Sequence, residues 1–317
     1  MSARWKQRPE GGGWFAIWLI RSIGRYGGRA VARALLYPIT LYFLLRRGPE
    51  RRASRAWLSL ALKRRAGLPD VARHIHCFAS TILDRVFLLS GELGRFDIRV
   101  HGGDALLARL DRDEGVLLFG SHLGSFEVLR ALAAQRPGLG LRVVYDRGHN
   151  AAMTQLLDAL NPEIAATAID AAQDGTTIML EIQRALAAGH LVALLVDRVQ
   201  PGEPSHPARF LGREARFPVA PWQVAAVLGA PVFLAFGLYR GGNRYDLVFE
   251  PFREGETVPR AQRAAHVAAL IPGYAARLEH YALDAPYNWF NFYDYWEAPA
   301  AGAAAGHQPR GAAAGPA

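Results

Sequence analysis

Short apolar runs alternate with amphipathic stretches between residues 96 and 250 of this chain. The runs are FDIRV at 96–100, VLLFG at 116–120, LRVVY at 141–145, LVALLV at 191–196, PVFLAFGLY at 231–239 and YDLVFE at 245–250. Runs that are apolar on successive residues are typical of central strands covered on both faces. Helical stretches are expected between them at 124–135, 150–160, 176–188 and 220–229. This alternation predicts an α/β fold in which helices flank a mixed open sheet.

Further helical patterns precede and follow the sheet region, at 56–93 and 260–283. About half of the 317 residues are apolar, so the chain can bury a substantial core. We expect an N-terminal membrane-associated segment at 1–48 and a folded domain at 49–298. Alanine, glycine and proline dominate 299–317, which predicts a disordered tail.

Two apolar runs near the amino terminus are flanked by arginines: WFAIWLI at 14–20 and ALLYPITLYFLL at 34–45. Neither run reaches the roughly 18 to 20 residues of a spanning helix. We therefore expect a helical segment that lies in the membrane interface or inserts shallowly. The basic residues after the second run would mark the cytoplasmic side. The alternative is a pair of helices buried in the core.

The excess of 37 lysines and arginines over 28 acidic residues gives a formal charge of +9. Such a charge favours anionic lipid headgroups, acidic carrier proteins or nucleic acid. Because the arginines cluster beside apolar runs, we expect an anionic membrane surface as a partner and no nucleic acid. The single cysteine, Cys77, excludes an intrachain disulfide and a thiolate metal cluster and is expected to be a buried thiol. No histidine shows metal-ligand spacing, so no metal is expected.

The segment SHLGSFE at 121–127 carries the clearest signal for chemistry. His122 leaves an apolar strand at its carboxyl end, where open α/β sheets place their sites. Glu127 falls in the first turn of the following helix and can fold back toward the imidazole. A carboxylate on one ring nitrogen would leave the other nitrogen to deprotonate an alcohol. Ser121 and Ser125 lack the serine-centred elbow of a hydrolase, so helix capping is the better interpretation of both.

The block SHLGSFE is followed by VVYDRGHN, LVALLVDR, RFLGREARFP and LGAPVFLAF. Together these motifs resemble the late acyltransferases of bacterial lipid A biosynthesis, the lauroyl and myristoyl transferase branch of the lysophospholipid acyltransferase superfamily. The resemblance covers about residues 14 to 296. It implies a glycerolipid acyltransferase-like fold, with His122 as general base and Glu127 as its orienting carboxylate.

The same resemblance implies an acyl carrier protein thioester or acyl-CoA as donor and a membrane lipid or glycolipid as acceptor. It implies no cofactor, and it places the protein at the bacterial inner membrane with the catalytic domain on the cytoplasmic side. The aromatic block APYNWFNFYDYW at 285–296 also resembles acyltransferases encoded with aryl polyene pathways. A non-catalytic basic scaffold at the membrane surface is the alternative, and it requires no chemistry at His122.

Three motifs depart from the usual pattern of the family. An aspartate separates Tyr145 from Arg147, and Asp197 is followed by Arg198 where glutamine is common. The aromatic ending WFNFYDYW is acidic and neutral where the family has a basic one. All three differences fall near the expected acceptor or phosphate side, which argues against a lipid A precursor as the acceptor.

Several other residues are candidates for substrate binding. Tyr145, Arg147 and Asn150 could hold a phosphate or the carrier pantetheine, although Asn150 is also a good N-cap. Asp197 and Arg198 close a strand on the catalytic edge, where the alternative is a local ion pair. The loop RFLGREARFP, with Arg209, Gly212, Arg213 and Arg216, could cover the site and receive an acidic partner, or could be an ordinary basic loop.

Overall fold

The computed structural model describes residues 14–129, 139–146, 167–200 and 202–296, with side chains from residue 28 onward. Its strands are β1 (Asp97–His101), β2 (Val116–Gly120), β3 (Leu141–Tyr145), β4 (Ile169–Asp170), β5 (Leu191–Leu195), β6 (Ser205–Phe210), β7 (Arg213–Pro218), β8 (Val232–Gly241) and β9 (Arg244–Arg253). Its α-helices are α1 (Trp14–Arg46), α2 (Gly48–Ala61), α3 (Leu68–Leu89), α4 (Gly103–Leu110), α8 (Gly175–Ala187), α9 (Ala220–Leu228) and α10 (Arg263–Asp284). Three short 3-10 turns are η1 (Leu93–Arg95), η2 (Arg260–Gln262) and η3 (Pro286–Asn288).

Seven of the described strands form one mixed sheet in the order β1-β9-β8-β2-β5-β3-β4. The β8–β9 pair is antiparallel and every other neighbouring pair is parallel. Strand β2 lies at the centre and is buried along its whole length. The predicted mixed α/β sheet flanked by helices is therefore confirmed, and each of the six predicted strands is present.

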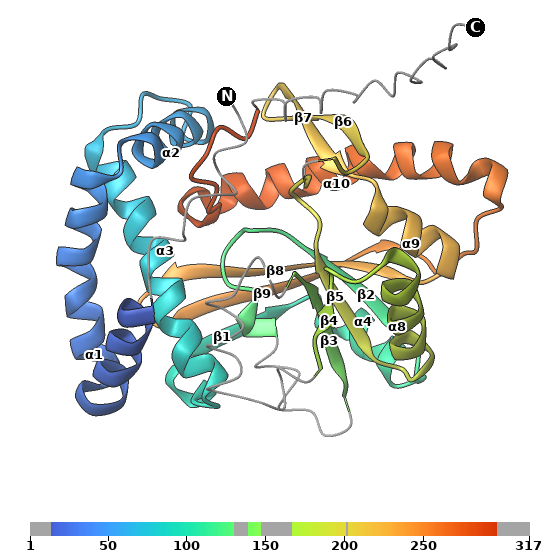
Figure 1. The fold of residues 1–317 in the computed structure, drawn as a ribbon, viewed down its shortest axis with the longest axis horizontal. Helices are drawn as coiled ribbons and strands as arrows, with labels where there is room; N and C mark the ends of the chain where they lie inside the picture. The colour runs from blue at the N-terminus through green and yellow to red at the C-terminus, as the bar shows by residue number, and fades with distance from the viewer. Residues whose placement is uncertain (1–13, 130–138, 147–166, 201, 297–317) are drawn as a thin grey trace, which may run out of the picture.

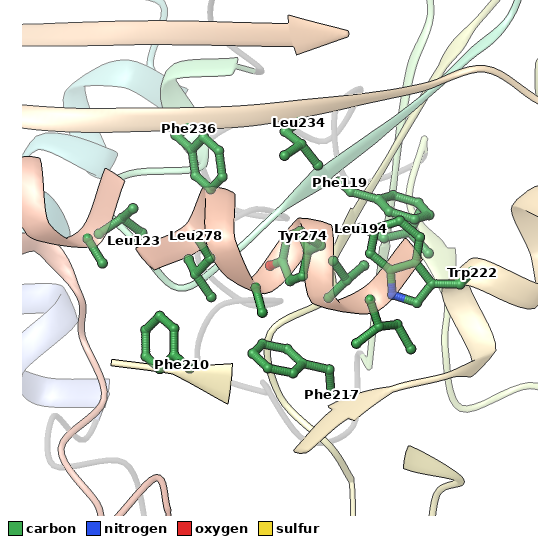
Figure 2. Packing of buried hydrophobic residues seen from close by; sticks show 14 of the residues in the cluster. Phe119, Leu123, Leu194, Phe210, Phe217, Trp222, Leu234, Phe236, Tyr274 and Leu278 are labelled. Atoms are coloured by element: carbon green, nitrogen blue, oxygen red, sulfur yellow. The ribbon is translucent and has the colours of Figure 1, made fainter. Parts of the chain in front are cut away.

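Alternate residues of the central strands enter two separate hydrophobic cores. Leu117 and Phe119 of β2 point to the face covered by α9 and α10, whereas Val116 and Leu118 point to the opposite face. Figure 2 shows the first core, in which Phe119 lies on the sheet side of Tyr274 from α10. This alternation is the pattern of a strand covered on both sides.

A separate hairpin, β6–β7, covers the outer side of α10, as Figure 1 shows. Phe210 and Phe217 from this hairpin are fully buried against α10 (Figure 2). The turn uses Leu211 and Gly212, both with positive φ. The prediction of a loop at RFLGREARFP was wrong in its secondary structure, because exposed arginines alternate with buried apolar residues on two paired strands.

The helical pattern at 56–93 corresponds to two helices and not to one. Helix α2 ends at Ala61, and α3 begins at Leu68 after the N-cap Gly67. Pro69 lies in the first turn of α3, where its missing N–H costs nothing, and Asp70 accepts a hydrogen bond from the Gly67 N–H. These features start a new helix and explain the break.

Helices α8, α9 and α10 confirm the patterns at 176–188, 220–229 and 260–283. The N-cap of α8 is Asp174, which accepts hydrogen bonds from the backbone N–H of Thr176 and Thr177. The chain is helical from Glu127 to Leu129, but most of the helix expected at 124–135 and all of that expected at 150–160 lie outside the described residues.

The N-terminal apolar runs both belong to α1, which contains a non-helical residue at Gly28 (φ 72°, ψ 169°). Within the described residues, one helix is long and apolar enough to cross a membrane, the 19-residue piece Gly28–Arg46. Ala32 and Leu36 are buried, whereas Tyr37, Leu41 and other large apolar side chains of this piece are exposed. The apolar run at 34–45 is shorter than this piece, because the helix continues through the arginines that precede residue 34. The division at residues 48 and 298 stays a prediction, and the tail at 299–317 lies outside the described residues.

Candidate active site

His122 and Asp197 meet at the carboxyl ends of two neighbouring parallel strands. In the register of β2 and β5, Gly120 pairs with Leu195, and the Val196 N–H donates to the Gly120 carbonyl (3.0 Å). His122 lies two residues after Gly120, and Asp197 lies two residues after Leu195. Parallel strands end at one edge of a sheet, so the two side chains arrive at the same place.

Asp197 makes two hydrogen bonds to His122. Its Oδ1 lies 2.8 Å from the imidazole Nδ1, and its Oδ2 accepts the His122 backbone N–H at 3.1 Å. The carboxylate is completely buried. Burial raises the pKa of Asp197, but His122 and Arg198 outweigh it, and the net pKa lies below the usual value. An ionised Asp197 therefore fixes the proton of neutral His122 on Nδ1.

The other ring nitrogen of His122 is left for chemistry. Burial lowers the pKa of His122, as does the nearby Arg198, and Asp197 opposes them only in part. The imidazole is therefore neutral near pH 7. The side chain retains 32% of its exposure, and within the described residues Nε2 has no hydrogen-bond partner. A neutral imidazole with a free Nε2 and a carboxylate on Nδ1 can take a proton from a hydroxyl.

Glu127 has a different partner from the one that the sequence predicts. Its Oε1 lies 2.9 Å from Nε of Arg85 on α3, and its Oε2 accepts from the Ser125 hydroxyl at 3.3 Å. Within the described residues no hydrogen bond joins Glu127 to His122, and the position of the orienting carboxylate on Nδ1 is occupied by Asp197. Glu127 is buried, and the Arg85 guanidinium is close enough to lower the pKa of His122. The structure thus connects Glu127 with the site through Arg85.

Two glycines allow the His122 turn to lie on β8. Gly124 has φ +77°, and a Cβ there would meet the Gly237 carbonyl oxygen at 2.0 Å. A Cβ at Gly237 would meet the Ser125 carbonyl oxygen at 2.2 Å. The Ser125 N–H donates to that Gly237 carbonyl at 2.8 Å. Close backbone approach therefore requires glycine at both positions and fixes the turn against the sheet.

Residues 286–296, which we call the C-terminal aromatic segment, form the other wall of the site. The Phe290 N–H donates to the His122 carbonyl and the Gly124 N–H to the Asn288 carbonyl, both at 2.9 Å. The Tyr295 hydroxyl donates to the Asp197 carbonyl at 2.7 Å. Figure 1 shows this red segment passing between α2 and α10. The aromatic block is visible in the sequence, but its hydrogen bonds to the backbone of both His122 and Asp197 could not be predicted from it.

The same segment holds Arg198. Its Nε donates to Oδ1 of Asn291 (2.9 Å), its Nη2 donates to the Phe290 carbonyl (3.0 Å), and its guanidinium lies over the Tyr293 ring. Arg198 is thus an ordered positive charge beside His122. The local ion pair between Asp197 and Arg198 is not among the salt bridges of the described residues, and Asp197 faces His122 instead.

The remaining predicted residues come from parts of the chain other than β2, β5 and the C-terminal aromatic segment. Tyr145 ends β3, the strand beside β5, and its carbonyl accepts from the Ala171 N–H. Arg213 lies over the Trp296 ring, 5.5 Å from its centroid, which brings the β6–β7 hairpin to the end of the aromatic segment. Arg147 and Asn150 lie outside the described residues.

Two other predictions concern single residue types. Cys77 is partly buried, and burial raises the pKa of its thiol to about 11, which makes it a poor nucleophile. In the part of the chain that the structure describes, no group of three or more His, Cys, Asp or Glu side chains is arranged to hold a metal ion.

Comparison with known proteins identifies one family. The sequence model for the bacterial lipid A biosynthesis acyltransferase family matches residues 89–296, about two thirds of the chain. The matched region contains His122, Glu127, Asp197 and the C-terminal aromatic segment, whereas α1 and α2 precede it. No curated protein matches the chain.

Proposed function

We propose that this chain, which belongs to the bacterial lipid A biosynthesis acyltransferase family, moves a fatty acyl group from a carrier thioester to a hydroxyl of a lipid or glycolipid. The family implies an acyltransferase with an acyl donor and a lipid acceptor. The observation that carries the finer proposal is the 2.8 Å contact between His122 Nδ1 and the buried Asp197. A membrane scaffold without catalysis would have no use for a buried carboxylate on a solvent-accessible imidazole.

In the proposed reaction His122 is the general base. Nε2 takes the proton of the acceptor hydroxyl while its oxygen attacks the thioester carbonyl carbon. When the tetrahedral intermediate collapses, the carbon–sulfur bond breaks and the thiolate leaves, taking the proton from the imidazolium. Asp197 stabilises the imidazolium and holds the ring orientation throughout. The products are an ester and a free carrier thiol.

Glu127 keeps a proposed role in the site, now together with Arg85. Arg85 is close enough to lower the pKa of His122, and it supplies a positive charge in a region of low exposure. Such a charge favours the negative charge that develops on the carbonyl oxygen in the transition state. Glu127 would fix the position of that guanidinium and act on His122 through it.

The donor is proposed to be an acyl carrier protein, with acyl-CoA as the alternative. Arg209, Arg213 and Arg216 are exposed on the β6–β7 hairpin. This basic surface is joined to the C-terminal aromatic segment through Arg213 and Trp296. An acidic carrier bound there would be next to the wall of the site. Positive charge facing an acidic partner favours rapid and selective encounter.

Membrane association is proposed to depend on α1. Its piece Gly28–Arg46 exposes large apolar side chains, whereas soluble surfaces rarely expose continuous apolar patches. Basic residues at its carboxyl end, Arg46 and Arg47, suit the cytoplasmic side of the bacterial inner membrane. The catalytic domain would then act on acceptors in that leaflet.

Mass spectrometry of cell lipids tests the proposed reaction and identifies the acceptor. Compared with wild-type cells, cells that lack the gene should lack one lipid species that carries an additional fatty acyl ester. The wild-type gene should restore it, and a gene encoding His122→Ala should not. Full restoration by His122→Ala, with equal protein levels, would refute acyl transfer by His122.

A further inference from the structure

A pocket of about 650 Å³ opens between α1 and α3. None of its lining residues belongs to the His122 site. Three arginines, Arg29, Arg33 and Arg95, line it together with Tyr37 and His76, and two alanines of α1 complete the wall. Figure 1 shows α1 on the outer side of α3, and the lining residues come from α1, from α3 and from the η1 turn that follows α3.

Positive charge exceeds negative charge in this pocket. The buried carboxylate of Asp84 binds Arg29 through two hydrogen bonds of 2.8 and 2.9 Å and is also the nearest acid to Arg33, at 4.0 Å. Arg95 is paired with Glu92 on the exposed rim. One internal carboxylate therefore serves two largely buried guanidinium groups, which leaves one positive charge to be neutralised from outside.

Arg33 carries that charge. Its Nη2 donates to the Tyr239 hydroxyl at 2.9 Å, but its Nη1 is buried and makes no hydrogen bond within the described residues. Buried guanidinium N–H groups nearly always have an acceptor. The ring of His76 stacks on Tyr37, with centroids 4.9 Å apart, and closes the pocket beside Arg33. An anionic oxygen in the pocket would complete the hydrogen bonding of Nη1.

An apolar row leads out of the pocket along α1. It consists of exposed side chains spaced three or four residues apart, which therefore lie on one side of the helix: Ala30, Ala34, Tyr37, Leu41 and Leu45. The row starts at the arginines and ends near Arg46. A ligand that follows it must combine an anionic head with a long apolar chain.

We propose that this pocket binds the phosphodiester headgroup of an anionic membrane phospholipid, with Arg33 as the main donor and one acyl chain along the apolar row. This inference rests on the proposed membrane association of α1. The ligand is a bilayer lipid and not the acyl acceptor, because the pocket shares no residue with the candidate active site. Asp84 of α3 pairs with Arg29 of the pocket, whereas Arg85 of the same helix pairs with Glu127. Binding would fix α1 against α3 at the membrane surface.

Calorimetric titration of the full chain in a non-ionic detergent tests this binding. The probe is dioctanoyl phosphatidylglycerol, with dioctanoyl phosphatidylcholine as the uncharged comparison and inorganic phosphate as competitor. Arg33→Gln should weaken phosphatidylglycerol binding about tenfold, the effect of one charged hydrogen bond. Arg99→Gln is the matched control, since it removes an exposed arginine on β1. Tyr37→Ala removes the exposed apolar wall, keeps every charge and should also weaken binding.

Equal binding by wild type, Arg33→Gln and Tyr37→Ala would overturn the proposal, as would equal affinity for the two lipids. Displacement of the lipid by millimolar phosphate would show a site for small anions and would also overturn it. Unchanged thermal unfolding midpoints establish that each variant is folded. Since the titration involves no turnover, a chain that binds the lipid but transfers no acyl group would refute only the proposed reaction.

Discussion

Nδ1 of His122 lies 2.8 Å from Oδ1 of Asp197, and both residues stand two positions beyond a register pair of the neighbouring strands β2 and β5. The backbone of the central sheet therefore sets the distance between imidazole and carboxylate. A pair supported in this way keeps its geometry without a bound substrate, which lowers the cost of ordering the site during the reaction.

Asp197→Asn is expected to reduce the rate of acyl transfer by about a hundredfold to ten-thousandfold, because an amide cannot stabilise the imidazolium or fix the Nδ1 proton. The amide oxygen can still accept the His122 backbone N–H, so the fold should persist. Steady-state turnover, with the thermal unfolding midpoint as the control, checks both expectations. A folded variant with wild-type turnover would show that Asp197 has no part in catalysis.

The rate should depend on pH as expected for a neutral base of low pKa. Burial, reinforced by Arg198, holds the pKa of His122 below its usual value, so kcat/KM should rise with pH and level off before pH 7. Asp197 opposes this shift, so in Asp197→Asn the pKa of His122 should fall further and the acid limb should move to lower pH. A profile from about pH 4.5 to 8 measures this shift. If the acid limb of the Asp197→Asn profile moved to higher pH, the result would contradict the contact between Asp197 and Nδ1 of His122.

Glu127→Gln should lower turnover and leave membrane binding intact, because the carboxylate pairs with Arg85 inside the domain. If Glu127 acts through Arg85, the double variant with Arg85→Gln should be no slower than the slower single variant. Turnover of all four proteins and liposome flotation provide the test. If the rate losses of the two single variants multiply in the double variant, Glu127 and Arg85 have independent roles. If Glu127→Gln loses flotation but keeps normal turnover, Glu127 has a different function.

The strands and the position of His122 could be predicted because both depend on local sequence. Uninterrupted apolar runs such as VLLFG determine buried strands, and His122 directly follows one of them. The partner of His122 could not be found in this way. The local sequence points to Glu127, five residues away, whereas Asp197 lies 75 positions along the chain and becomes a neighbour only through the pairing of β2 with β5.

The C-terminal aromatic segment shows the same limit. Its hydrogen bonds to the His122 turn and to Arg198 connect residues more than ninety positions apart along the sequence. The β6–β7 hairpin was missed because its exposed strand positions carry arginine and glutamate, which made an apolar alternation resemble a basic loop. The structure of such segments is determined by tertiary packing and not by local preference.

Leu41→Ser with Leu45→Ser should weaken liposome binding more than tenfold, because each leucine loses about 1.5 to 3 kcal/mol of burial in lipid. Both side chains are more than half exposed, so the fold should be unaffected. Leu107→Ser, at an exposed position of α4, is the matched control. Flotation measures binding, and undiminished flotation of the double variant would contradict anchoring by α1. Deletion of residues 1–48 is a poorer test, because it also removes the partner of buried Asp84.

Transfer of a labelled acyl group by purified His122→Ala, measured beside the wild type with acyl carrier protein thioester and a hydroxyl acceptor in proteoliposomes, tests general-base catalysis by His122 most directly. The wild type should form the ester. His122→Ala should form it about a hundredfold to ten-thousandfold more slowly while unfolding at a similar temperature. Ester formation by folded His122→Ala at a rate close to that of the wild type would contradict the proposed mechanism.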